Sequence, residues 1–145
     1  KSVDKNFDSS QFVCDWLQRD LLNIIFGNSD NHGRNTSFLK KSGRIFLAPI
    51  YDFAPMKADP EVVTRSTTWG SPYEEGGEYR WEGITQNLAH WCEPHISLST
   101  LKILASKLLG LKQQLINKGV PQTIIDMPGL GYDFIEAKLS RWELL

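Results

Sequence analysis

The chain opens with an amphipathic helix pattern whose two ends are both marked. Apolar side chains recur three or four positions apart, which predicts a helix that buries one face: these are Phe12, Val13, Trp16, Leu17, Leu21, Ile24 and Ile25. Asp8 and Gln11 form a capping-box pattern at its start, and Gly27 can adopt the left-handed conformation that ends a helix. The helix therefore delivers the chain into residues 28–35, which have no aliphatic side chain and are predicted to be a loop.

A β-hairpin and a long connection are predicted after this loop. Residues 36–39 and 44–49 favour strands and are separated by Lys40-Lys41-Ser42-Gly43, which indicates a hairpin. From Met56 to Trp81 the periodicity disappears. An ordered loop of that length is usually functional or mobile.

The rest of the chain has helical periodicity. We expect a short helix over residues 84–91 and a longer one over residues 97–118, where leucines alternate in steps of three and four. Asp133 and Glu136 form a second capping-box pattern, which predicts the start of a last helix. The predicted fold class is mainly α with a small β-hairpin.

Composition limits the class of protein. A chain of 145 residues with 41% hydrophobic side chains can form one domain, residues 1–145, but not two large lobes. A net charge of -1 provides no strong positive field for nucleic acid, and no apolar run reaches the ~18 residues of a membrane span. We expect neither nucleic acid nor membrane as a direct partner. Cys14 and Cys92 do not form a disulfide framework, which favours a reducing, cytoplasmic setting.

Three oxygen-bearing side chains have the spacing of a phosphotransferase. Asp30 and Asn35 form D-x-x-x-x-N in the loop after the first helix, and Asp52 lies beyond the hairpin. Mg²⁺ prefers oxygen ligands, so a carboxylate and an amide can bind it while a second carboxylate serves the proton of a substrate hydroxyl. The hairpin explains how residues so distant in sequence can meet, because it returns the chain toward its starting point.

Two stretches resemble the core motifs of the HipA-like serine/threonine kinases, which are toxins of bacterial toxin–antitoxin modules. The stretches are GNSDNHGRNTS at positions 27–37 and LAPIYD at positions 47–52. The resemblance implies that Asp30 is the catalytic aspartate, that Asn35 and Asp52 hold Mg²⁺ and the ATP phosphates, and that His32 shapes the catalytic loop. Arg34 joins this catalytic group, because it keeps the positive charge of the lysine that is usual there.

The resemblance also implies a fold and partners. The chain corresponds to the mainly helical C-terminal lobe of a protein-kinase-like fold, with ATP held between two lobes. Neither G-x-x-x-x-G-K-[ST] nor G-x-G-x-x-G occurs in the sequence. We therefore expect the chain to be part of a longer protein, with the nucleotide-binding lobe elsewhere, and to be inactive alone. The implied partners are a protein substrate, such as an aminoacyl-tRNA synthetase, and a HipB-like antitoxin.

Several alternatives stay open at this stage. A small-molecule or lipid phosphotransferase would fit, because phosphatidylinositol kinases have a similar D-x-H-x-x-N loop, and so would a non-catalytic lobe that binds a partner. Trp69 and Trp81 either attach the polar loop to the body of the protein or contact a partner. Arg65 can meet a phosphate or an acidic substrate, although a lone arginine in a loop is more often solvated.

Overall fold

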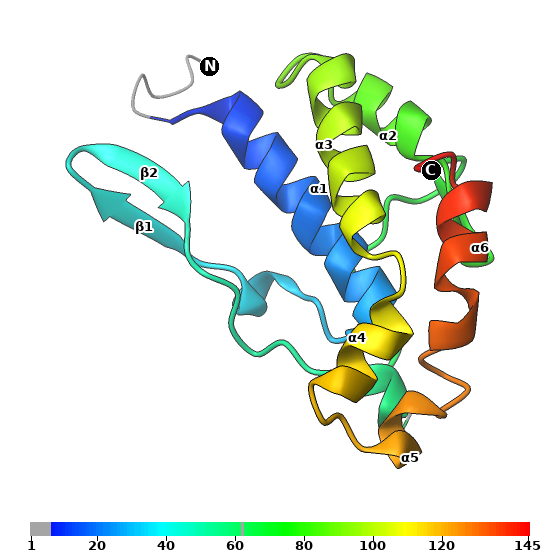
Figure 1. The fold of residues 1–145 in the computed structure, drawn as a ribbon. Coiled ribbons are helices and arrows are strands. Elements are labelled where there is room, and N and C mark those ends of the chain that lie inside the picture. Colours follow the sequence, from blue (N-terminus) through cyan, green and yellow to red (C-terminus); the bar gives the residue numbers. More distant parts are fainter. Residues whose placement is uncertain (1–6, 62) are drawn as a thin grey trace.

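A computed structural model describes residues 7–61 and 63–145, and its fold is mainly helical with a small hairpin, as predicted (Figure 1). Helix α1 spans Ser9–Phe26. The Asp8 side chain accepts a hydrogen bond from the Gln11 backbone N–H at 3.0 Å, and Gly27 ends the helix with a φ of 71°. The Gln11 side chain donates to Asp15 and does not reach back to Asp8, so only half of the capping box forms.

The other helices pack around α1 and enclose one apolar core. Helix α3 runs along α1, and α2 packs against α3 (Figure 1). The deepest side chains include Leu17 and Leu21 of α1, Leu101 of α3 and Leu139 of α6, all fully buried. The elements are α2 (Trp81–Asn87), α3 (Pro94–Lys107), α4 (Leu111–Asn117), α5 (Gln122–Ile125) and α6 (Ile135–Arg141). Among the described residues, none of these helices is long and apolar enough to cross a bilayer.

The predicted helix over residues 97–118 is wrong, because the chain breaks there into α3 and α4. Gly110 lies between them with a φ of 65°, a conformation that redirects the chain. The leucine spacing conceals this break, since Leu108 and Leu111 are buried on either side of it. The short helix predicted over residues 84–91 corresponds to α2, which begins earlier than predicted, at Trp81.

The second capping box is also wrong. Helix α6 begins without a side-chain cap. Asp133 instead accepts a hydrogen bond from Lys112 at 2.7 Å, and Glu136 accepts one from the backbone N–H of Gly110 at 3.2 Å. Both acidic side chains therefore join α6 and the turn before it to the break between α3 and α4.

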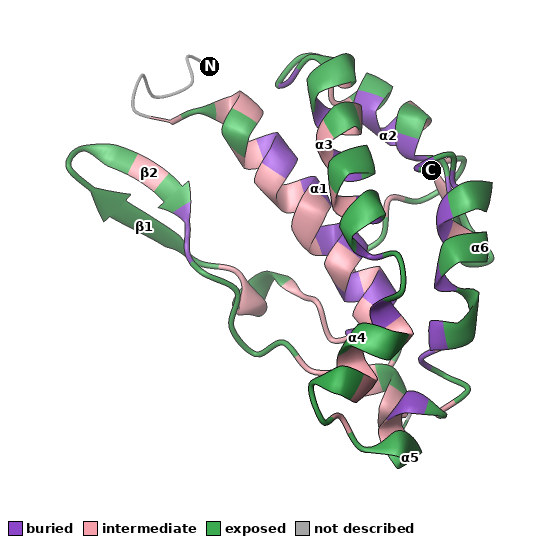
Figure 2. Cartoon of the chain, viewed as in Figure 1, coloured by how far each residue is buried: buried purple, intermediate pink, exposed green. Residues whose placement is uncertain are grey.

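The hairpin consists of β1 (Phe38–Lys41) and β2 (Arg44–Leu47), paired antiparallel with Phe38 opposite Leu47. Ser42 and Gly43 form a two-residue turn in which both φ angles are positive, which matches the twist of a hairpin. The hairpin projects from the helical body and is mostly exposed (Figures 1 and 2). At its base, Arg19 of α1 donates a hydrogen bond to the carbonyl oxygen of Ala48.

The described residues of the long connection after the hairpin contain three short elements. These are a 3₁₀ turn, Met56–Ala58, and the strand pair β3 (Glu74–Glu75) and β4 (Glu78–Tyr79). Trp81, at the start of α2, is fully buried in the core, and the Trp69 indole N–H donates to Asp20 of α1. Both tryptophans therefore attach the connection to the body of the protein.

Candidate active site

The loop that follows α1 starts from a tightly held base. The backbone N–H of Asn28 donates to Asn23 O at 2.8 Å, and its side-chain amide donates to Asn23 Oδ1 at 3.0 Å. Both asparagines are buried. The carbonyl oxygen of Gly27 accepts hydrogen bonds from the N–H groups of Ser29 and Lys57. A Cβ at Gly27 would lie 2.7 Å from Leu130 Cδ2, so a side chain at this junction requires the buried Leu130 to shift.

Asp30 and His32 lie side by side on the loop. His32 Nε2 is 3.6 Å from Asp30 Oδ1, longer than a hydrogen bond but close enough for attraction when the ring is protonated. The other ring nitrogen, Nδ1, is buried and has no hydrogen-bond partner among the residues that the structure describes. His32 therefore flanks the Asp30 carboxylate.

A 3₁₀ turn, Gly33–Asn35, folds Asn35 back onto Asp30. The backbone N–H of Asn35 donates to His32 O at 2.9 Å, and its side-chain Nδ2 donates to Asp30 O at 3.0 Å. The amide nitrogen is thus committed to the loop, while Oδ1 accepts no hydrogen bond from the described residues. This geometry gives a structural reason for the D-x-x-x-x-N spacing.

Asp52 is brought to the same loop by its neighbour Tyr51. The Tyr51 hydroxyl donates to the carbonyl oxygen of Arg34 at 2.9 Å and lies 2.8 Å from Ser37 Oγ. On the other side, Phe53 packs edge-on against Phe26 of α1 with ring centroids 5.6 Å apart. Asp52 itself is exposed and has a φ of 53°, a left-handed conformation that aspartate tolerates better than most residues.

The predicted site residues differ in what their side chains contact. A polar cavity beside the loop is lined by Asn35, together with Asn31 and Tyr51, but not by Asp30, His32, Arg34 or Asp52. Arg34 is exposed, and its guanidinium forms no ion pair with any described residue. Asp30 contacts His32 and Asn35 directly. The Arg34 backbone in turn accepts a hydrogen bond from Tyr51.

The donor set suits magnesium held together with phosphate oxygens. Residues 7–61 and 63–145 contain no group of three or more His, Cys, Asp and Glu side chains arranged to hold a metal ion. Asn35 Oδ1 and the exposed Asp52 carboxylate can both supply oxygen atoms to a metal ion. Neither has a hydrogen-bond or ion-pair partner among the described residues. Mg²⁺ commonly uses one or two such protein ligands and completes its shell with waters and substrate phosphates.

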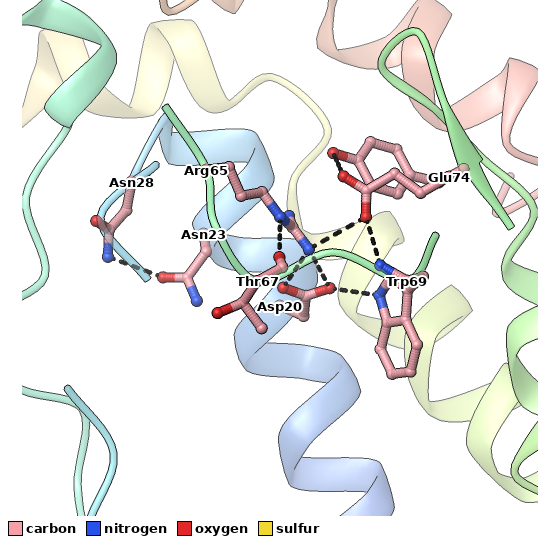
Figure 3. A network of polar contacts seen from close by, with 8 residues as sticks. Asp20, Asn23, Asn28, Arg65, Thr67, Trp69 and Glu74 are labelled. Carbon is pink, nitrogen blue, oxygen red and sulfur yellow. Dashed lines mark hydrogen bonds and ion pairs between the residues drawn. The ribbon is translucent and has the colours of Figure 1, made fainter. Parts of the chain in front are cut away.

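The sequence did not reveal a buried polar network centred on Asp20 of α1 (Figure 3). Asp20 is only 4% exposed, and its two carboxylate oxygens lie 2.9 and 3.0 Å from Arg65 Nη2. The Trp69 indole N–H donates to the same carboxylate at 2.7 Å. Glu74 accepts the Trp69 backbone N–H and the Tyr79 hydroxyl, and it lies 3.6 Å from Arg65. Arg65 is therefore paired and largely buried, not solvated.

The network holds the long connection against α1. Burial raises the pKa of Asp20, while the Arg65 charge and the Trp69 N–H oppose that rise. A signal for it was present in the sequence, because Asp20 stands at helical spacing from Leu17 and Ile24 on the apolar face of α1. An acidic residue at such a position requires a partner.

A second cavity separates this connection from the start of the loop. Its walls include Asn28 and Ser29 on one side and Arg65, Glu74 and Tyr79 on the other. Next to it, three buried polar atoms have no hydrogen-bond partner within residues 7–61 and 63–145: Asn28 Oδ1, Ser29 Oγ and Arg65 Nη1. The polar connection therefore walls a cleft that adjoins the residue before Asp30.

The chain has the elements expected of the helical C-terminal lobe of a kinase-like protein: a capped helix, a polar loop with a folded-back asparagine, a hairpin and a second aspartate. The family model described as HipA-like C-terminal domain matches residues 4–110, and the chain belongs to this family. The match spans α1, the loop, the hairpin, the long connection, α2 and α3. No curated protein and no solved structure gives a significant match to the chain.

Proposed function

We propose that the chain is the catalytic lobe of a serine/threonine protein kinase that transfers the ATP γ-phosphoryl group to a protein hydroxyl, as the toxin of a toxin–antitoxin module. Membership of the HipA family, which is kinase-like, supports this proposal. The observation that carries it is the hydrogen bond from Tyr51 to the Arg34 carbonyl oxygen. That bond holds the segment containing Asp52 against the loop that contains Asp30 and Asn35.

Each side chain has a role that follows from its surroundings. Asp30 accepts or orients the proton of the substrate hydroxyl. Its carboxylate is available for this role because no N–H or O–H group of the described residues donates to it. His32 restricts the position of that carboxylate, and Arg34 places a positive charge beside the loop. Asn35 and Asp52 would hold Mg²⁺ through their oxygens. When bound, Mg²⁺–ATP supplies the phosphoryl group and neutralises charge during its transfer.

The cleft beside Asn28 and Ser29 has mixed walls: Arg65 and Glu74 offer polar groups, whereas Ile24 and Val63 offer apolar surface. The choice between a protein and a lipid acceptor therefore rests on a phosphotransfer assay that offers both. We extend the proposal to a HipB-like antitoxin as partner, an aminoacyl-tRNA synthetase as one class of substrate, and a cytoplasmic setting, in which Cys14 and Cys92 stay reduced as they are here.

The test is a phosphotransfer assay with radiolabelled ATP and three classes of acceptor: proteins, inositol lipids and aminoglycosides. The chain is assayed alone and together with a separately expressed nucleotide-binding lobe. We expect labelling of protein only, and only with both lobes present, because phosphate positioning requires groups that this sequence does not encode.

Asp30→Ala is the decisive variant, and Asn31→Ala is its matched control on the same loop. Asp30→Ala should reduce labelling at least tenfold without altering the circular dichroism spectrum, whereas Asn31→Ala should retain most of it. Labelling of lipid or aminoglycoside but not protein would replace the proposal with its small-molecule alternative. No labelling in any combination would favour the non-catalytic lobe.

A further inference from the structure

The two cysteines, which are distant in sequence, meet in the core. Cys14 lies on α1 and Cys92 lies in the bend before α3, and their Sγ atoms are 3.9 Å apart. Both are free thiols and both are buried. Figure 1 shows α1 and α3 running side by side.

We propose that Cys14 and Cys92 form an oxidisable dithiol, which a two-electron oxidant such as hydrogen peroxide converts into a disulfide that joins α1 to the start of α3. This proposal is independent of the proposed function. A disulfide requires the sulfur atoms to approach to about 2.05 Å, so the pair must close by roughly 2 Å. Cys92 lies outside any helix, and that segment can supply much of the movement.

The reaction balances with the peroxide as the only co-reactant. One thiol reduces hydrogen peroxide to water and becomes a sulfenic acid. The second thiol attacks the sulfenic sulfur, the S–S bond forms, and the hydroxyl group leaves as a second water with the thiol proton. The protein loses two hydrogen atoms in total, and the peroxide is reduced to two waters.

The surroundings of the sulfurs determine the rate. Burial raises the pKa of the Cys14 thiol, so little thiolate exists there at neutral pH and its reactions accelerate as the pH rises. The Ser10 hydroxyl donates a hydrogen bond to Cys92 Sγ at 3.2 Å. The pair should therefore react slowly at pH 7 but selectively with each other, because each is the nearest thiol to the other.

Closure would enclose the candidate active site in a covalent ring. The two cysteines are 78 positions apart, and the segment between them contains Asp30, His32, Arg34, Asn35 and Asp52. A cross-link over a loop of this length restricts the unfolded chain strongly, so the melting temperature of the oxidised protein should rise by roughly 5–10 °C.

The experiment treats the folded chain with a small excess of hydrogen peroxide at pH 7 and pH 8.5 and follows the intact mass. We expect a loss of two hydrogen masses, faster at the higher pH, a cross-linked peptide pair containing Cys14 and Cys92, and a melting temperature that returns to its initial value with dithiothreitol. Cys14→Ala and Cys92→Ala are the controls, and neither should form the intramolecular link.

Two results would overturn the proposal. One is a wild-type chain that gains one or two oxygen atoms, or forms disulfide-linked dimers, without losing two hydrogens. The other is a link that forms only in denaturant, which would show that the folded core does not bring the sulfurs together. Both readouts use the wild-type chain, so they remain valid if a cysteine variant does not fold.

Discussion

Asp20 and Arg65 are 45 positions apart in sequence, yet Arg65 Nη2 lies within 3.0 Å of both carboxylate oxygens of the buried Asp20. The pair joins the helix that carries the candidate catalytic loop to the connection that walls the neighbouring cleft. Each partner is costly to bury alone, so the interaction is best judged by what happens when one member is removed.

Arg65→Ala should lower the free energy of unfolding by about 3–5 kcal/mol, because it leaves the Asp20 carboxylate buried without a countercharge. The double variant Asp20→Leu/Arg65→Met should lose less stability than the sum of the losses from Asp20→Leu alone and Arg65→Met alone. Urea denaturation of the wild type, these two single variants and the double variant measures this coupling. Arg34→Ala, at an exposed site, is the control and should change stability by less than about 0.5 kcal/mol.

Gly27→Ala should destabilise the chain more than Gly43→Ala does. Both glycines have positive φ, 71° and 79°, so each substitution carries backbone strain of about 1–2 kcal/mol. Only at Gly27 would the added Cβ also meet Leu130 Cδ2 at 2.7 Å. Thermal unfolding of the two variants separates the backbone strain, which both share, from the steric clash with Leu130, which only Gly27→Ala has. Equal melting temperatures would show that Leu130 moves aside freely.

Asn35→Ala and Asp52→Ala should both raise the Mg²⁺ concentration needed for phosphotransfer, with Asp52→Ala the greater loss. A carboxylate contributes charge as well as coordination, whereas an amide only coordinates. The measurement is a Mg²⁺ titration of activity with both lobes present. Superimposable titration curves for wild type and both variants would remove these residues from the metal site.

Alkaline pH should destabilise the fold through two buried tyrosines. Burial raises the pKa of Tyr79 and of Tyr132 above the ordinary value of about 10. The folded chain then keeps protons that the unfolded chain releases. The resulting stability is complete below about pH 10 and is lost as the pH rises toward the raised values.

Phenolate absorbance, recorded together with circular dichroism, tests this prediction. The signal of Tyr79 and Tyr132 should appear only as the fold is lost, and Tyr79→Phe or Tyr132→Phe should each remove part of that late signal. The sequence contains four tyrosines. If all four ionise while the helical spectrum is unchanged, burial does not protect these hydroxyls.

Local patterns predicted the parts of the fold that depend on local interactions. The periodicity and the end signals of α1 were sufficient because Asp8 and Gly27 act on neighbouring backbone groups. The hairpin followed from strand-favouring residues around a turn. The break at Gly110 was missed because the leucine pattern continues through it, with Leu108 and Leu111 buried on either side.

The candidate site also has one part that a local pattern predicted and one part that no local pattern revealed. The D-x-x-x-x-N spacing predicted that Asp30 and Asn35 lie together, because one 3₁₀ turn folds Asn35 back onto Asp30. Asp20 was not singled out, and Arg65 was noted without its partner, since a pair so far apart in sequence leaves no spacing to recognise. The burial of Asp20 among α1 leucines was the available clue, and the identity of its partner required the fold.

Helix α1 is uninterrupted from Ser9 to Phe26, and this continuity has a mechanical consequence. Cys14, Asp20 and the end of the helix at Phe26 follow one another at intervals of about 9 Å along its axis. A rigid helix does not let such points move independently. A displacement of Cys14 along the helix axis would therefore also move Asp20 and the base of the Asp30 loop.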